Sequence, residues 1–158
     1  MSGDYVVNVE GAIYDGDRYL MAFRSEQEAH AGGTLAFAGG KMEGTETPDA
    51  LEETLRREIR EEVGVEVDDL AYVKSSTFGE DPPCLDIVFL CRYVSGTARA
   101  IDPAEVSAVQ WMTFDDALAH PKTPPWIADS LRRAEEKRRT RLEANERIYR
   151  KRGAGEGS

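Results

Sequence analysis

Three glutamates, Glu58, Glu61 and Glu62, could do chemistry together because of their spacing. On a helix they stand at i, i+3 and i+4, so their carboxylates share one face. Like charges gathered this closely destabilise a helix unless a cation lies among them. A hard divalent ion such as Mg²⁺ prefers carboxylate oxygens, keeps several waters and commonly bridges to substrate phosphates. The spacing therefore predicts metal-dependent phosphate chemistry.

The segment around these glutamates has the signals of a helix. Thr47-Pro48 predicts its start, because Thr can cap a helix and Pro suits the first helical position. Gly64 predicts its end, as a natural residue just past a helix. An apolar stripe repeats every four residues beside the acidic one: Leu55, Ile59 and Val63. We therefore expect a helix from about Pro48 to Val63 that docks on a sheet and holds its carboxylates at the edge of the contact.

The rest of the chain predicts strands on both sides of this helix and further helices after them. The expected strands are Tyr5 to Tyr14, Arg18 to Phe23, Thr34 to Phe37, Leu70 to Thr77, Leu85 to Val94 and Ser107 to Thr113. A short helix from Phe114 to His120, a long charged helix from Trp126 to about Lys151 and a disordered end from Gly153 to Ser158 follow. The fold class is therefore expected to be α/β (α+β), an α/β/α sandwich with a mixed central sheet and a long C-terminal helix.

The charge of the chain is unevenly distributed. Its 158 residues carry a net charge of −10, with −14 over residues 1–125 and +4 over residues 126–158. An acidic body is a poor surface for a nucleic-acid backbone, which favours clustered Lys and Arg. Extended nucleic acid is therefore excluded as an expected ligand, whereas a small metal-complexed phosphate compound fits, because the metal supplies the positive charge.

Two cysteines and the lack of long apolar runs bear on the compartment. Cys84 and Cys91 are seven residues apart, so on a strand they face opposite sides and cannot pair locally. The first residues lack a basic region followed by a long apolar run, and no stretch approaches a membrane helix in length. We expect reduced thiols and a soluble, cytoplasmic protein without a membrane partner.

The stretch from Gly39 to Val65, GGKMEGTETPDALEETLRREIREEVGV, resembles the signature of the Nudix hydrolase family (MutT-like). That signature is Gly, five residues, Glu, seven residues, Arg-Glu, an aliphatic, any residue, Glu-Glu, any residue, Gly and an aliphatic. Gly40 and Glu46 satisfy its first half, and REIREEVGV over residues 57–65 satisfies its second half completely. The resemblance spans residues 4–134, so we predict a hydrolase domain over 1–134 and a charged helical extension with a disordered tail over 135–158.

The signature departs from the family's pattern at one point. Ten residues, 47–56, separate Glu46 from Arg57 where the pattern has seven, which indicates a three-residue insertion. Either Glu46 or Asp49 could therefore take the first-Glu role. That role is mostly to brace the arginine, so the metal site is expected to survive the insertion.

The resemblance implies a metal site and a reaction. The ligands would be Glu58, Glu61, Glu62 and the carbonyl of Gly39, holding Mg²⁺, for which Mn²⁺ could substitute. Arg57 would pair with an acidic neighbour and orient the helix. The pair Gly39-Gly40 would let the backbone bend sharply and come close to the ion. The substrate would be a small nucleoside diphosphate linked to another group, cleaved within the diphosphate.

Four further points stay open at this stage. The general base could be a glutamate of the signature or an acidic residue from a distant loop, with Glu105 as the outside candidate and Glu80 or Asp81 as weaker ones. His30 suits either a surface position or contact with substrate. Trp126 suits either a cap on the sandwich or a place in the lining of the pocket. The charged C-terminal helix is either solvated or an arm of a possible homodimer. A binding module that senses the same ligand without cleaving it is the alternative to an enzyme.

Overall fold

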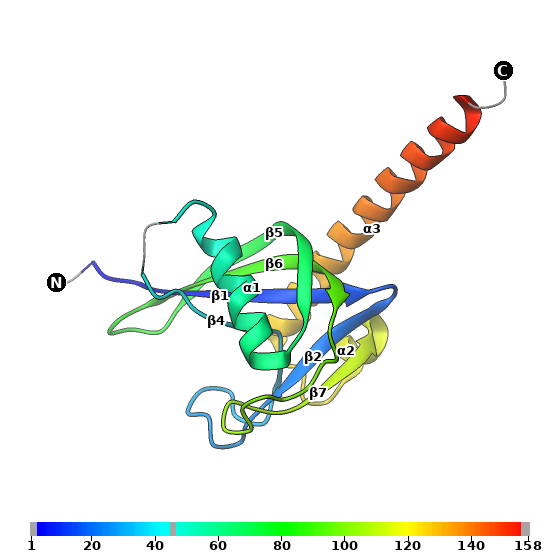
Figure 1. Cartoon of the computed structure of the whole chain (residues 1–158). Helices are drawn as coiled ribbons and strands as arrows, with labels where there is room; N and C mark the ends of the chain where they lie inside the picture. Colours follow the sequence, from blue (N-terminus) through cyan, green and yellow to red (C-terminus); the bar gives the residue numbers. More distant parts are fainter. Residues whose placement is uncertain (1–2, 45–46, 156–158) are drawn as a thin grey trace.

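The computed structural model describes residues 3–44 and 47–155 as a mixed sheet with helices on both faces (Figure 1). Its strands are β1 (Val6–Asp15), β2 (Arg18–Arg24), β3 (Leu35–Ala36), β4 (Ala38–Lys41), β5 (Glu66–Phe78), β6 (Cys84–Ser95) and β7 (Val106–Thr113). Its helices are α1 (Ala50–Val63), α2 (Phe114–Ala119) and α3 (Pro125–Gly155). None of these helices is long and apolar enough to cross a membrane.

Strand β1 is the centre of the sheet. Within the seven-stranded sheet, five strands are hydrogen-bonded neighbours in the order β3-β2-β1-β6-β5. In addition, β4 pairs with β1 and β7 pairs with β2. The pairing of β1 with β6 is parallel, from Val6 opposite Cys84 to Tyr14 opposite Arg92, whereas its pairings with β2 and β4 are antiparallel. The predicted mixed α+β architecture is therefore confirmed.

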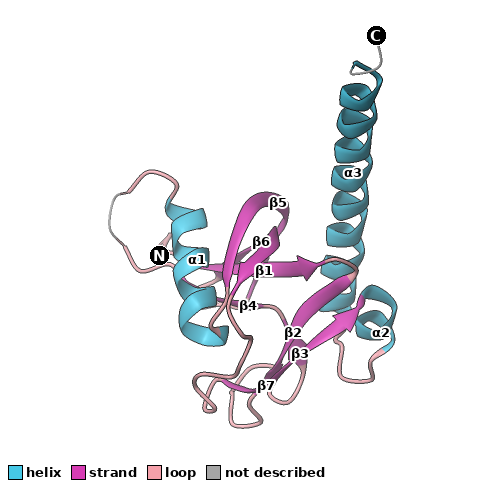
Figure 2. Ribbon diagram, turned by 45° about the vertical axis from the view of Figure 1, so that its right-hand side comes forward, coloured by secondary structure: helices cyan, strands magenta, loops and turns pink. Residues whose placement is uncertain are grey.

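The two faces of the sheet carry separate apolar cores, because side chains alternate along each strand. Val9 and Ile13 of β1 pack in the cluster that contains Leu55, Ile59 and Val63 of α1. Ala12 and Tyr14 of the same strand pack in the other cluster, with Ile127, Leu131 and Ala134 of α3. Figure 2 shows α1 on one side of the sheet and both α2 and α3 on the other. The apolar stripe read from the sequence is thus the buried face of α1.

Helix α1 starts later than the sequence predicts. It begins at Ala50 rather than near Pro48, and its N-cap is Asp49, which has φ 56° and makes no side-chain cap hydrogen bond. The expected Thr47 cap is therefore wrong. The predicted end is confirmed: Gly64 has φ 74°, and its N–H donates to the carbonyls of Ile59 and Arg60.

Other differences concern the ends of elements. The strand expected from Thr34 to Phe37 is split into β3 and β4, and β5 begins at Glu66, four residues before the prediction. Residues 153–155 belong to α3 rather than to a disordered end, and residues 156–158 lie outside the described part. Cys84 and Cys91 are both free thiols, as expected.

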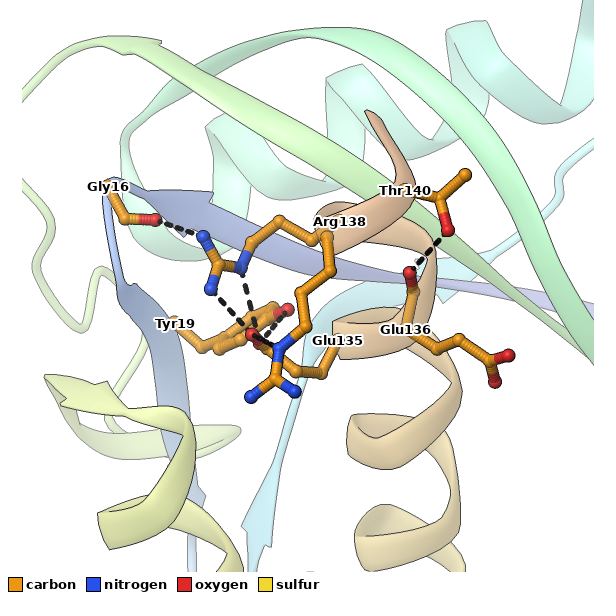
Figure 3. Close-up of polar contacts among 7 residues, drawn as sticks. Gly16, Tyr19, Glu135, Glu136, Arg138 and Thr140 are labelled. Atoms are coloured by element: carbon orange, nitrogen blue, oxygen red, sulfur yellow. Dashed lines mark hydrogen bonds and ion pairs between the residues drawn. The ribbon is translucent and has the colours of Figure 1, made fainter. Parts of the chain in front are cut away.

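Helix α3 is attached to the body through Glu135, whose residue is only 3% exposed (Figure 3). Its carboxylate accepts hydrogen bonds from the Tyr19 hydroxyl at 2.8 Å and from Arg138 at 2.5 Å. Burial alone would raise the pKa of Glu135, but these hydrogen bonds outweigh it and hold the pKa below its usual value. One to two turns further on, Arg141 donates to the Tyr14 hydroxyl at 3.1 Å and to the carbonyl of Asp69 at 2.7 Å. The end of α3 beyond these contacts extends away from the sheet (Figure 1). The predicted domain boundary between residues 134 and 135 falls inside this continuous helix and stays a prediction.

Replacing Glu135 with alanine tests this attachment. The Tyr19 hydroxyl and the Arg138 guanidinium would lose a buried acceptor, so we expect the free energy of unfolding to fall by about 2 kcal/mol in urea titrations. The neighbouring Glu136→Ala variant is the matched control, because the Glu136 side chain is exposed (Figure 3). Equal stability of the two variants would contradict the attachment.

Candidate functional site

Two of the three predicted helix glutamates, Glu58 and Glu62, border a cavity of about 360 Å³. Glu58 and Glu62 reach it from α1, Gly39 and Gly40 from β4, and Glu105 from the segment just before β7. We call it the acidic cavity. Three carboxylates from two distant parts of the chain thus meet beside a stretch of strand backbone.

Gly39 and Gly40 serve this site through close approach rather than through a bend. Both lie within strand β4, and neither has a positive φ, so the expected sharp bend is wrong. A Cβ at Gly40 would overlap the carboxylate of Glu58 and lie 2.8 Å from its Cγ. A Cβ at Gly39 would overlap the backbone carbonyl of Val9. The lack of side chains here lets α1 bring its carboxylates against β4.

The carboxylates of the acidic cavity repel one another. The pKa of Glu62 is raised to about 8, first by burial and then by the charges of Glu105 and Glu58, against the lowering effect of a hydrogen bond from the Gly39 N–H. The pKa of Glu58 is also raised, first by burial, against the lowering effect of Arg57. Because a cation among these groups would favour their charged forms, the site has the electrostatics of a cation-binding site.

The donor set suits a hard divalent cation. The carboxylates of Glu58 and Glu62 and the backbone of Gly39 offer oxygen ligands around one cavity. In residues 3–44 and 47–155, no three His, Cys, Asp or Glu side chains form a ready-made metal cage. Mg²⁺ does not need such a cage, since it keeps waters and binds through one or two carboxylates together with substrate phosphates.

The remaining predicted residues of the helix, Arg57 and Glu61, do not line this cavity. Glu61 is exposed and does not line it, although its charge contributes to the raised pKa of Glu58. Arg57 donates to the carboxylate of Glu58 at 3.1 Å. The acidic residue with which Arg57 was expected to pair is therefore Glu58, the next residue in the chain. The Nε atom of Arg57 is buried and has no hydrogen-bond partner among the described residues.

The question of the first glutamate of the signature stays open. Glu46 falls outside the described residues, and Asp49 is exposed at the N-cap of α1. Of the loop candidates for a general base, Glu105 lines the acidic cavity. Glu80 and Asp81 are exposed in the β5–β6 loop and do not line it.

A second cavity, of about 340 Å³, adjoins the first and was not predicted from the sequence. The two share Asn8, Arg24 and Ala36 as lining residues. We call it the aromatic cavity, because His30, Phe78 and Trp126 line it. Of the two interpretations left open for His30 and Trp126, the structure therefore favours a position in a pocket.

Polar side chains on neighbouring strands also line the aromatic cavity. Asn8 of β1 donates to Asp86 of β6 at 2.7 Å, and Glu10 lies two residues further along β1. The pKa of Glu10 is raised well above its usual value, first by burial and then by its hydrogen bond with Asp86. The signal in the sequence was the presence of carboxylates in otherwise apolar strands, VVNVEGAIYD and CLDIVFLCRYVS.

Comparison with known protein families identifies one match over most of the chain. The model of the NUDIX domain matches residues 4–134. Two curated relatives are both described as NAD-capped RNA hydrolase NudC. The one from Salmonella paratyphi C is 35% identical over 114 residues, and the one from Escherichia coli K12 is 34% identical over 114 residues. Each alignment covers 72% of this chain but 40% of the relative, so the chain spans less than half the length of these proteins.

Solved structures share the fold. The MutT NUDIX hydrolase from Burkholderia pseudomallei superposes with a TM-score of 0.70 at 24% identity, covering 82% of this chain and 98% of that one. The Escherichia coli ORF135 protein superposes with a TM-score of 0.64 at 26% identity, covering 87% and 93%. The similarity thus extends over nearly the whole length of both structures.

Alanine at Gly40 should disturb the site without unfolding the protein. Its Cβ would overlap the flexible carboxylate end of Glu58, which must then move away from β4. We expect thermal unfolding to change little and divalent-metal binding, measured by calorimetry, to weaken about tenfold or more. Gly44→Ala is the control, because among the described residues no heavy atom beyond its chain neighbours lies within 4 Å of its added Cβ. Unchanged metal binding in the Gly40→Ala variant would contradict the site.

The raised pKa of Glu62 predicts how stability depends on pH in the absence of metal. Because the folded state holds this proton up to about pH 8 and the unfolded state loses it near the ordinary value of 4.5, stability should fall as pH rises between these values. The Glu62→Gln variant, which stays neutral, should show a smaller fall in urea titrations with a chelator present. An equally steep fall in the variant would contradict the environment described for Glu62.

Proposed function

The chain belongs to the Nudix hydrolase family, and we propose that it is a metal-dependent hydrolase that cleaves the diphosphate linkage of a nucleoside diphosphate linked to another group. One observation carries the proposal. Glu58, Glu62 and Glu105 converge on one cavity, and that cavity shares three lining residues with a second, aromatic one. The first suits a metal-bound diphosphate, and the second gives room for the organic part of the substrate.

We assign the metal ligands to the oxygens that border the acidic cavity. Glu58, Glu62 and the carbonyl of Gly39 would hold Mg²⁺, with Mn²⁺ as a substitute, and Glu61 would add a carboxylate from the exposed edge. Bound there, the ion would offset charge on the diphosphate oxygens and lower the pKa of an attacking water. Arg57 supports this set by holding one oxygen of Glu58.

Glu105 is the proposed general base. Its side chain is exposed to water, yet its charge is the largest electrostatic influence of any side chain on Glu62. Hydrogen bonds of its backbone to Ser25 and to Asp102, both at 3.0 Å, fix its position. Glu105 would accept a proton from the water as the water oxygen bonds to phosphorus. The bond from that phosphorus to the bridging oxygen breaks, and two monophosphates leave.

The description of the relatives narrows the class of substrate that we propose. Their description as NAD-capped RNA hydrolases points to a dinucleotide-type diphosphate, in which the linkage joins two nucleosides. The chain spans 40% of their length, so we carry over the type of linkage rather than the capped RNA. The homodimer expected from the charged helix stays a prediction.

Replacing Glu62 with glutamine tests the metal assignment. We expect turnover to fall by about 100-fold, because the variant loses a charge that holds the ion, while the fold is kept. The matched control is Glu53→Gln on the same helix, since Glu53 is exposed, lies outside the cavity and pairs with Arg56. Similar rates in both variants would overturn the assignment.

The substrate assay should compare NAD, ADP-ribose, dinucleoside polyphosphates, nucleotide sugars and nucleoside triphosphates. Each is incubated with Mg²⁺ or Mn²⁺, and an added phosphatase releases phosphate from monophosphate products. We expect turnover of at least one diphosphate-linked compound and its loss with a chelator. No turnover on any compound, together with metal-dependent thermal stabilisation by one of them, would replace the hydrolase with the sensing module.

A further inference from the structure

The segment of residues 96–105 connects β6 to β7 and passes over the C-terminal end of α1. We call it the strap. The N–H of Arg99 donates to the carbonyl of Val63 at 3.0 Å, and the N–H of Ile101 donates to the carbonyl of Glu62 at 3.2 Å. The last four carbonyls of a helix have no partner within the helix, so the strap supplies partners that α1 needs. It is thereby attached to the same residue whose carboxylate borders the acidic cavity.

The strap also packs closely against this end of the helix. Gly96 has φ 98°, which favours glycine, and a Cβ on it would lie 2.5 Å from the carbonyl oxygen of Gly64. Ile101 covers the same residue, because a Cβ on Gly64 would lie 3.5 Å from the Cδ1 atom of Ile101. Hydrogen bonds and close packing therefore fix the path of the strap across α1.

The end of the strap is a tight turn that Asp102 and Pro103 stabilise. The carbonyl of Asp102 accepts from the N–H groups of Glu105 and Val106, both at 3.0 Å. Its carboxylate accepts from the N–H of Ala104 at 3.0 Å. Asp at the first position and Pro at the second are favoured in such a turn, because Asp bonds to the backbone two residues on and Pro presets φ. Three hydrogen bonds to one residue thus determine where the chain turns toward the cavity.

Glu105 leaves this turn with its backbone held on both sides. Its N–H donates to Asp102, and its carbonyl accepts from the N–H of Ser25 at 3.0 Å. Ser25 is buried, so this second anchor belongs to the body of the protein. Glu105 is itself exposed, so its backbone rather than side-chain packing determines where its carboxylate lies. From there its charge raises the pKa of both Glu58 and Glu62.

We propose that Asp102 is a positioning residue, which closes the turn of the strap and so holds the carboxylate of Glu105 beside Glu62. The inference rests on the proposed function, because it states how the base of the same site is held. Since the strap is hydrogen-bonded to the carbonyl of Glu62, the base and the metal ligand share one support. A shift of α1 would carry both groups with it and keep their spacing.

The kinetic test compares Asp102→Ala with Asp102→Asn in the full chain. The substrate is the diphosphate-linked compound that the wild type hydrolyses fastest in the assay above. Alanine leaves the N–H of Ala104 without its acceptor, whereas the amide oxygen of asparagine can still accept from it. We expect Asp102→Ala to lower kcat about tenfold with little change in KM, because the base is displaced while the substrate keeps its contacts. Asp102→Asn should retain most of the wild-type kcat.

Two further variants complete the series. Asp115→Ala is the matched control, because Asp115 is an exposed residue of α2 outside the lining of the acidic cavity, and it should leave kcat unchanged. Pro103→Ala loosens the same turn without removing a hydrogen-bond acceptor, so it should lower kcat in the same direction as Asp102→Ala. Thermal unfolding of each variant checks that the fold is kept.

A second measurement does not depend on turnover. Mn²⁺ is paramagnetic and broadens the NMR signals of nearby amides with a steep dependence on distance. With Mn²⁺ added, we expect the broadening of the Glu105 amide signal to decrease in Asp102→Ala and to be kept in Asp102→Asn. The broadening of the Gly40 amide signal should be the same in both variants and in the wild type, since β4 does not contain the turn.

Equal kcat in the wild type and Asp102→Ala would overturn the inference. An equal fall in Asp102→Asn would also overturn it, because the effect would then come from the charge of Asp102 rather than from the turn. Unchanged broadening at Glu105 in Asp102→Ala would show that the turn does not need this residue. Absence of turnover in the wild type would instead overturn the proposed function, and the broadening would still decide whether Asp102 holds Glu105 in place.

Discussion

The site depends on the close approach of α1, β1 and β4, which three glycines allow: Gly11 and Gly40 where α1 meets the strands, and Gly39 where β4 meets β1. A Cβ at Gly11 would lie 3.0 Å from the Ile59 side chain, and a Cβ at Gly39 would overlap the backbone of β1. A Cβ at Gly40 would overlap Glu58. With hydrogen atoms in these places the helix settles onto the sheet through Leu55 and Ile59. The same contact delivers its glutamates to the cavity, so core packing and the position of the carboxylates have one cause.

Strand β1 connects this contact to the aromatic cavity. Its odd-numbered residues pack under α1, whereas Asn8 and Glu10 line the aromatic cavity on the face that α3 covers. The parallel pairing with β6 places Asn8 opposite Asp86, and the antiparallel pairing with β4 places Glu10 opposite Gly39. One strand therefore determines the spacing between the backbone of Gly39 and the polar side of the aromatic cavity. A shift in its register by one residue would exchange the two faces.

What could be predicted from the sequence was mostly local. The spacing of Leu55, Ile59 and Val63 gave the buried face of α1, and Gly64 gave its end, because both signals lie within a few residues. The start was misplaced, since Thr47-Pro48 looked like a cap and the backbone of Asp49 took that place. The meeting of Asn8 with Asp86, 78 residues apart, follows from a parallel pairing that no local pattern specifies. Glu105 was named as a candidate, but its approach to Glu62 depends on the position of a distant loop.

The charges of the two cavities explain why a diphosphate could enter such an acidic body. Carboxylates outnumber cations in the lining of the acidic cavity, and without a bound cation they would repel a phosphate. Arg24 lines both cavities, and its charge lowers the pKa of Glu10 on one side and of Glu62 on the other. Arg24 also pairs with Glu28 at 3.6 Å, and its Nε donates to the carbonyl of His30. The contact with His30 holds the guanidinium near the aromatic cavity. Because Arg24 lines both cavities, its guanidinium and a divalent ion at Glu58 and Glu62 would together offset the diphosphate charge of a ligand that spans them.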